Sequence, residues 1–216
     1  MPAFRHSKLI FAPLILLMLY FAASHSFADD VVGRVIAISG DAELHQGDAV
    51  QRGTALREGD TLTTGEDARV RMRFVGGSVI TVGADSRFEV ATYRPARDEQ
   101  PQQARFRLLD GVVLAFAEGV AGHEDEEYVI ETQAASMGIR GTIVWGGYFI
   151  AEQADFVLFK GGPVDITNDI GSVTLTEPGQ GTTVPVDADG VGVDGPFEPE
   201  FWTPAKAFEA TTTIAF

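Results

Sequence analysis

Short apolar runs, separated by turn residues at intervals of about ten residues, extend through most of this chain. In the clearest run, Val70, Met72 and Phe74 alternate with three arginines, and Gly76-Gly77 follows. A period of two places alternate side chains on opposite faces of a half-buried β-strand, and a Gly-Gly turn between two such runs predicts a hairpin. Similar runs occur at 31–38, 106–116, 128–132, 143–150, 156–159, 164–167 and 173–176.

This pattern predicts a single all-β domain of short antiparallel strands and tight turns, built as a solenoid or a sandwich. Only residues 204–211 carry a helix signal, with Thr203 as the N-cap and Pro204 at the first helical position. We therefore expect a short C-terminal helix at most.

The first 28 residues have the three parts of a secretory signal peptide. Arg5 and Lys8 are basic, residues 9–23 are apolar apart from Pro13, and Ser26-Phe27-Ala28 precedes a plausible cleavage point. The apolar run is short for a membrane span, which needs about 17–25 residues. Residues 1–28 therefore predict export to the periplasm or secretion, with no integral membrane span after cleavage. A retained anchor is the alternative.

Composition restricts the classes of function. The chain has 16 Lys and Arg against 31 Asp and Glu, a net charge of −15, which argues against nucleic acid and anionic lipid as partners. A hydrophobic fraction of 45% is too high for a disordered chain. Because there is no cysteine, disulfides, thiolate metal sites and a cysteine nucleophile are excluded.

No catalytic set assembles in the sequence, so we predict no enzyme activity, no catalytic residue, no cofactor and no metal site. After residue 28 the only histidines are His45 and His123, and no Gly-x-Ser-x-Gly, His-Glu-x-x-His or phosphate-loop motif occurs. The acidic stretch 187–198 leaves calcium binding open. It follows part of the spacing of an EF-hand loop, but Val191 stands where an oxygen ligand is needed.

Positive charge is concentrated between residues 69 and 107, which hold eight arginines and four acidic residues. Arg69, Arg71 and Arg73 project from one face of a predicted strand, so they are candidates for contact with a partner. The alternative is that these arginines solubilise an outer sheet face or pair with acids on neighbouring strands.

The order and spacing of several turn blocks resemble the FecR-domain family. The likeness covers residues 31–186 and leaves 187–216 as a Gly-, Pro- and Asp-rich tail. Gly76 stands where the family usually has an acid, and Gln133 where it usually has proline. The blocks are Val32-Gly33-Arg34-Val35, residues 52–65, residues 70–74 with Gly76-Gly77-Ser78, Leu109-Asp110-Gly111, Glu131-Thr132, Ile139-Arg140-Gly141-Thr142, residues 159–164 and Pro178-Gly179-Gln180.

The resemblance implies an exported β-domain without catalysis, related to proteins that relay a receptor's state to a sigma-factor regulator. Only eight residues precede the apolar run, so we do not expect the cytoplasmic regulator segment here. Arg140 has two interpretations, as a side chain that locks a turn or as a partner contact. The residues to which the resemblance assigns structural roles in turns are Gly53, Gly59, Asp60, Thr64, Gly77, Ser78, Gly111, Thr132, Arg140, Gly141 and Thr142.

The predicted function is therefore binding of an envelope protein or cell-surface component, and the process that the resemblance suggests is extracytoplasmic signalling. One alternative is a structural or adhesive surface protein that forms homo-oligomers through its sheet edges. The other is an enzyme that acts on polysaccharide through a pair of carboxylates.

Overall fold

The computed structural model describes residues 30–45, 47–96, 102–117, 127–150 and 153–216. The predicted signal peptide, residues 1–28, lies outside the described residues. None of the described residues forms a helix that is long and apolar enough to cross a bilayer.

The described residues form two β-sheets, which we call the first and the second sheet. The first sheet has the order β4 (Ala55–Arg57), β1 (Val31–Ser39), β6 (Arg69–Phe74), β7 (Val79–Val82), β10 (Val112–Phe116), β13 (Ile143–Ile150), β14 (Gln153–Lys160), β17 (Gln180–Pro185) and β18 (Glu200–Phe201). The second sheet has the order β3 (Asp48–Ala49), β2 (Ala42–Leu44), β5 (Thr61–Thr64), β8 (Arg87–Arg94), β9 (Gln103–Asp110), β11 (Glu127–Thr132), β12 (Ser136–Ile139), β15 (Val164–Thr167) and β16 (Ser172–Leu175).

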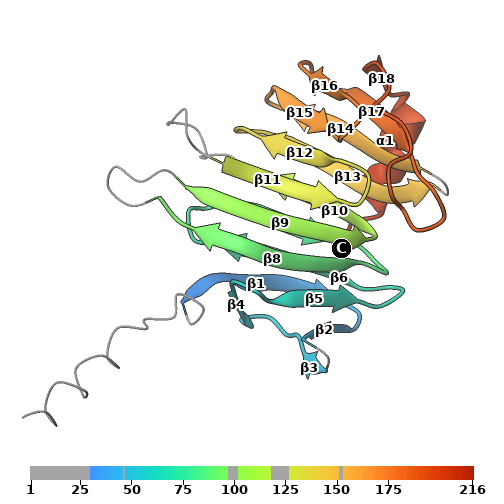
Figure 1. Ribbon diagram of the computed structural model, residues 1–216. Helices are drawn as coiled ribbons and strands as arrows, with labels where there is room; N and C mark the ends of the chain where they lie inside the picture. Colours follow the sequence, from blue (N-terminus) through green and yellow to red (C-terminus); the bar gives the residue numbers. More distant parts are fainter. Residues whose placement is uncertain (1–29, 46, 97–101, 118–126, 151–152) are drawn as a thin grey trace, which may run out of the picture.

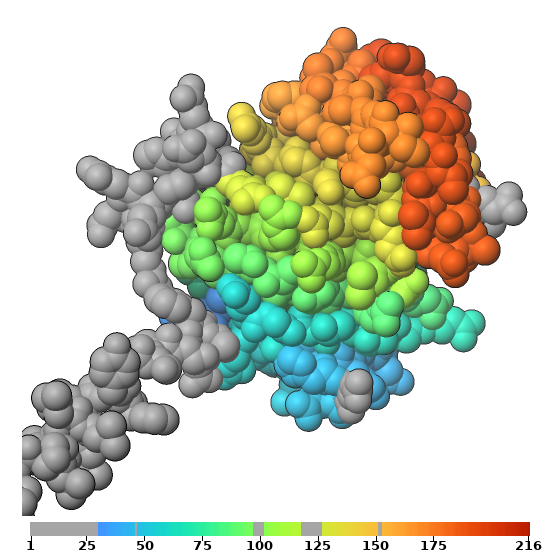
Figure 2. Space-filling model, viewed as in Figure 1, coloured from blue at the N-terminus to red at the C-terminus, as the bar shows by residue number. Residues whose placement is uncertain are grey.

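Both sheets progress from N-terminal strands at one edge to C-terminal strands at the other, as the colours of Figure 1 show. The space-filling view in Figure 2 shows the same progression over the surface. The chain crosses repeatedly between the two sheets, so the architecture has the layers of a sandwich and the linear progression of a solenoid. The prediction of an all-β single domain is confirmed.

One pair of strands departs from the expected antiparallel pattern, because β9 and β11 are parallel. Other excursions into a sheet are mostly hairpins such as β6–β7, which turns at Gly76-Gly77 as predicted. Between β9 and β11 the chain visits the first sheet as the single strand β10. With one intervening strand, the chain re-enters the second sheet in its original direction.

The core between the sheets follows from the alternation seen in the sequence. On β6, Val70, Met72 and Phe74 are at most 2% exposed, whereas the arginines between them point outward. The Phe106 ring lies at the centre of an aromatic cluster, 4.9 Å from Phe74 and 5.5 Å from Tyr128 between ring centroids. Aromatic pairs at this separation stabilise by about 0.5–1.5 kcal/mol beyond the area that they bury.

Helix α1 (Pro204–Thr212) covers part of the outer face of the first sheet. Thr203 is its N-cap and accepts a hydrogen bond from Lys206 N at 3.2 Å, and Pro204 occupies the first turn, so the predicted helix is confirmed. Residues 187–216 thus contribute β18 and α1. The apolar cluster beneath α1 joins residues far apart in the sequence: Val112, Trp145, Val157, Trp202, Ala210 and Ile214.

Candidate interaction surface

The outer face of β6 presents three arginines beside a fourth on β1. In the strand register, Arg73 lies directly opposite Arg34, Arg71 opposite Ala37 and Arg69 opposite Ser39. On the other side of β6, Arg73 faces Val79 and Arg71 faces Thr81. No acidic residue occupies any of these cross-strand positions. We call Arg34, Arg69, Arg71 and Arg73 the arginine face.

The arginine face uses only neutral partners among the described residues. Arg34 Nη1 donates to Gly53 O at 3.2 Å, and Arg69 Nη1 donates to Asp67 O at 3.0 Å. Arg71 Nε donates to Thr81 Oγ1 at 3.1 Å, and its guanidinium lies 4.6 Å from the centre of the Phe216 ring. Arg69 Nε is buried and has no hydrogen-bond partner in the described part of the chain.

Exposure differs along this face. Arg34 and Arg73 are exposed, whereas Arg69 and Arg71 are half-buried. None of the four forms an ion pair with the described residues. The arginine face therefore carries guanidinium groups that water and other chemical partners can reach.

Half-buried apolar residues continue this surface across the first sheet. The register runs from Arg73 on β6 to Val79 on β7, then to Phe116 on β10 and Ile143 on β13. The three apolar side chains are each partly exposed. The surface thus combines a cationic side with an adjacent apolar strip.

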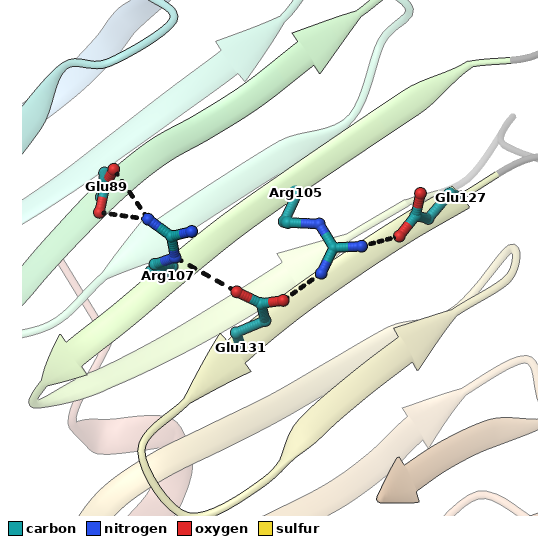
Figure 3. Close-up of polar contacts among 5 residues, drawn as sticks. All are labelled: Glu89, Arg105, Arg107, Glu127 and Glu131. Atoms are coloured by element: carbon teal, nitrogen blue, oxygen red, sulfur yellow. Dashed lines mark hydrogen bonds and ion pairs between the residues drawn. The ribbon is translucent and has the colours of Figure 1, made fainter.

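The outer face of the second sheet treats its arginines differently (Figure 3). Arg107 Nη1 lies 3.3 Å from Glu89 Oε1, and Arg107 Nε lies 3.3 Å from Glu131 Oε2. Arg105 forms ion pairs with both Glu131 and Glu127. The hydrogen bond from Arg107 to Glu131 and the charge of Glu89 raise the pKa of the Arg107 guanidinium. We call these five residues the ion-pair ladder.

The sequence left two interpretations open for this arginine-rich stretch: pairing with acids on neighbouring strands, or availability for a partner. Each interpretation fits the arginines of a different sheet. Pairing with acids across strands describes Arg105 and Arg107 on β9, with partners on β8 and β11. It does not describe Arg69, Arg71 or Arg73, which have no such partner among the described residues. Arg34 was not identified from the sequence, because only the strand register places it opposite Arg73.

The sequence-predicted glycines lie at corners of the chain. Gly53, Gly59, Gly77, Gly111 and Gly141 all have positive φ angles, between 63° and 96°. At Gly111 an added Cβ would lie 1.9 Å from Ser86 Oγ, so the turn requires both the conformation and the small size of glycine.

Three of the predicted polar residues hydrogen-bond the backbone: Asp60 and Thr132 bond groups three positions away, whereas Thr64 bonds groups 19 and 22 positions away. Asp60 Oδ2 accepts from Arg57 N at 2.7 Å, and its Oδ1 lies 2.6 Å from His45 Nε2. Thr64 Oγ1 donates to Gly83 O at 2.7 Å and accepts from the backbone N–H of Ser86 at 2.9 Å. Thr132 Oγ1 accepts from Ala135 N at 3.0 Å. These side chains fix turns and do not line a cleft.

Arg140 lies in the turn between β12 and β13 and is exposed, without a hydrogen bond or ion pair to the described residues. The structure does not place it in the row of arginines on β6. Ser78 and Thr142 are buried, and the hydroxyl of each lacks a hydrogen-bond partner among the described residues.

A polar cluster surrounds Ser78 between the sheets. Tyr93 Oη donates to Val75 O at 2.6 Å and accepts from Gln102 Nε2 at 3.3 Å. Burial raises the pKa of Tyr93 to about 12 and raises the pKa of Tyr128 still further. Tyr128 Oη is buried and accepts or donates no hydrogen bond within the part of the chain that the structure describes. Both phenols are therefore neutral at physiological pH and serve the core.

The acidic stretch 187–198 does not gather into a metal cage, since no three His, Asp or Glu side chains converge within the part of the chain that the structure describes. Asp187 Oδ1 instead accepts the backbone N–H groups of Asp189 and Val191, each at 3.0 Å. Asp187 and Asp189 border a cleft of about 290 Å³ beside Asp110 and Tyr148. The Asp187 carboxylate thus stabilises a turn at the edge of that cleft.

The fold and this surface define a two-sheeted all-β domain with one neutralised outer face and one cationic outer face. Residues 60–161 match the family model described as FecR protein, so this part of the chain is similar to a FecR domain. The family resemblance seen in the turn blocks is thus confirmed. A search of curated proteins finds no match.

Two solved structures share the fold. Both are crystal structures of a candidate anti-sigma factor from Parabacteroides distasonis ATCC 8503, at 2.50 Å and 1.65 Å resolution. They are 13% identical to this chain, with TM-scores of 0.52 and 0.51, and the match covers 68% of this chain. This chain spans 62% of the length of that protein. At this identity the similarity concerns the fold.

Proposed function

We propose that this protein is an exported, noncatalytic FecR-type domain that binds a protein or other envelope component in extracytoplasmic signalling. The FecR match and the fold shared with the candidate anti-sigma factor support a role in signalling. The signal-peptide pattern in residues 1–28 supports a periplasmic or secreted location.

The arginine face is the observation that carries the proposed binding role. Arginine is suited to interfaces because its planar guanidinium donates in a fork that matches carboxylates and is weakly hydrated. The ion-pair ladder shows that this chain neutralises arginines on an outer sheet face where neighbouring strands supply acids. On the arginine face the counter-charge is left for a partner to provide.

The sheet edges offer a weaker basis for the alternative of a surface protein that assembles through its strands. The edge strands β3, β4 and β18 have two or three residues each, and the remaining edge strand, β16, has four. Short edge strands limit pairing with another chain. A net charge of −15 also makes copies of this chain repel one another.

Site-specific photocrosslinking in the producing cell tests this function. A photoreactive residue replaces Val79, beside Arg73 on the first sheet, and a control replaces the exposed Thr63 on the second sheet. We expect a reproducible crosslink to an envelope partner from position 79 only. Charge reversal of Arg71 and Arg73 should abolish this crosslink. The same reversal at Arg94, which is exposed on the second sheet, should leave the crosslink intact.

A crosslinked partner from position 63 alone, or none from position 79, would refute docking at the arginine face. An intact mass of the chain in the envelope fraction tests export independently. A chain beginning at Asp29 supports cleavage, whereas one beginning at Met1 and found in the cytoplasm would overturn the proposed location.

A further inference from the structure

The spacing of the arginine face matches the repeat of an extended polypeptide. Arg69, Arg71 and Arg73 occupy alternate positions of one strand. At about 3.3 Å per residue, successive arginines are about 6.6 Å apart along β6 and the row spans about 13 Å. An extended partner segment has the same repeat, so acidic side chains at alternate positions can each reach one guanidinium.

The opposition of Arg34 and Arg73 points to an anion between them. The two residues are direct cross-strand partners, and like charges in such positions are destabilising. A carboxylate bound between two guanidiniums removes this repulsion and forms short, charge-assisted hydrogen bonds. The free protein therefore has a local electrostatic strain that an acidic partner relieves.

The neighbouring apolar strip indicates that the partner is a polypeptide with apolar side chains as well as acids. Val79 lies next to Arg73 in the register, Phe116 lies next to Val79, and both are partly exposed. The guanidinium of Arg71 already stacks on the ring of Phe216, so this surface accommodates aromatic groups beside its charges. A purely ionic ligand would leave the strip uncovered.

The charge of the whole chain argues against a large polyanion at this site. Electrostatic interactions extend over a Debye length of about 8 Å at physiological ionic strength. A membrane surface or a nucleic acid presents negative charge over a far wider area than four arginines, so the acids elsewhere on a chain of net charge −15 repel it. A short segment with a few acids meets mainly the arginine face.

We propose that the arginine face binds an extended segment of a partner protein that carries acidic residues at alternate positions and apolar residues next to this acidic stretch. This inference rests on the proposed function and adds the chemistry of the partner. The acids project from one side of the segment and pair with Arg34, Arg71 and Arg73, and the apolar residues beside the acidic stretch cover Val79 and Phe116.

The test uses the full exported chain and a fluorescent peptide containing Glu-Val-Glu-Val-Glu, with anisotropy as the readout. One control peptide has the same composition with the glutamates contiguous, and a second has Lys in place of each Glu. We expect the alternating peptide to bind at least tenfold more tightly than either control, and the double variant R71E/R73E to lose at least tenfold in affinity. R94E should bind like the parent chain.

A second variant distinguishes a binding surface from a merely structural one. Arg73→Thr removes the repulsion with Arg34 and places a good strand former on β6. We expect its melting temperature to rise by about 1–3 °C while its affinity for the alternating peptide falls at least threefold. Arg94→Thr is the matched control, and it should neither raise the melting temperature nor lower the affinity for the alternating peptide.

Phosphate and vesicles of 30% phosphatidylglycerol in phosphatidylcholine complete the panel. Displacement of the peptide by millimolar phosphate, or binding to these vesicles that the R71E/R73E variant loses, would replace the proposal with a small-anion site or a lipid site. Absence of peptide binding overturns the inference. If the crosslink from position 79 persists in that case, the proposed function stands and only the partner chemistry is wrong.

Discussion

Replacing Lys206 with Met tests how the C-terminal helix is held against the first sheet. Lys206 Nζ lies 2.8 Å from Asp155 Oδ1 and 4.2 Å from the centre of the Trp202 ring. The Asp155 side chain is 0% exposed and that of Lys206 is 24% exposed. Methionine keeps much of the apolar stem of lysine and removes its charge, so the substitution isolates the ion pair from the packing.

The expected loss follows from the surroundings of Asp155. Removing one partner of a buried ion pair destabilises by about 3–5 kcal/mol, because an uncompensated charge stays buried. Asp155 retains two other hydrogen bonds, from Thr183 Oγ1 at 2.7 Å and from Gln153 Nε2 at 2.8 Å. We therefore expect the lower end, about 3 kcal/mol, which lowers the melting temperature of a domain of this size by about 6–12 °C.

Tryptophan fluorescence makes the assay specific for the helix. The sequence has two tryptophans, Trp145 and Trp202, and both lie in the cluster beneath α1 with ring centroids 6.0 Å apart. Far-UV circular dichroism reports mainly on the two sheets. We expect the fluorescence transition of K206M to shift below the circular-dichroism transition, because the contact of α1 fails first. Glu209→Gln, exposed on the same helix, should stay within about 0.5 kcal/mol of the parent.

Denaturation of K206M within 0.5 kcal/mol of the parent chain would refute this reasoning. The double variant D155N/K206M separates charge from packing, because it leaves no charge buried at this contact. We expect it to recover part of the stability lost in K206M. A double variant less stable than K206M would assign the loss to packing.

Four further predictions concern two core tyrosines, the ion-pair ladder and a glycine in β13. Burial raises the pKa of Tyr93 to about 12, so between about pH 10 and pH 12 the folded protein keeps the phenol proton that the unfolded chain loses. The contribution of Tyr93 to the free energy of unfolding is therefore complete below about pH 10 and is lost as the pH rises to about 12. Tyr93→Phe should reduce this pH dependence, as measured by urea denaturation. Tyr128→Phe removes a phenol without a hydrogen-bond partner and should leave stability at pH 7 unchanged or higher, whereas Tyr93→Phe loses about 1–2 kcal/mol. Glu131→Gln should lower stability by about 0.5–1 kcal/mol in low salt and by less in 1 M NaCl, since the ladder is partly exposed. Gly147→Ala should cost about 3 kcal/mol by thermal unfolding, because φ is 140° and the added Cβ would lie 2.3 Å from Gly111 O.

Local chemistry explains why the strands and turns could be predicted from the sequence. The alternation on β6 assigns its faces without reference to any other strand, since side chains alternate along an extended chain. The N-cap at Thr203 likewise predicts α1 from four neighbouring residues. Glycine at positive φ depends mainly on its own backbone, as at Gly59.

The contacts that distinguish one arginine from another are not local. Arg105 and Glu131 are 26 positions apart, and Lys206 and Asp155 are 51 apart. Such pairs depend on which strands become neighbours and on their register, neither of which the alternating pattern specifies. The parallel pairing of β9 with β11, which brings Arg105 to Glu127 and Glu131, has no counterpart in the pattern of either strand.

Among the residues that the structure describes, the arginine face has no acidic partner, and this is informative because acids are abundant in this chain. With 31 acidic residues against 16 lysines and arginines, an arginine on an outer sheet face is more often expected opposite an acid than opposite another cation. The second sheet follows this expectation at Arg107, which has an acid on both sides. The first sheet instead places Arg34 beside Arg73. Stability alone favours the first arrangement. The second is the arrangement that the proposed partner would require, because such a partner supplies the missing negative charge. The rise in melting temperature expected for Arg73→Thr measures the repulsion between Arg34 and Arg73 on which this argument depends.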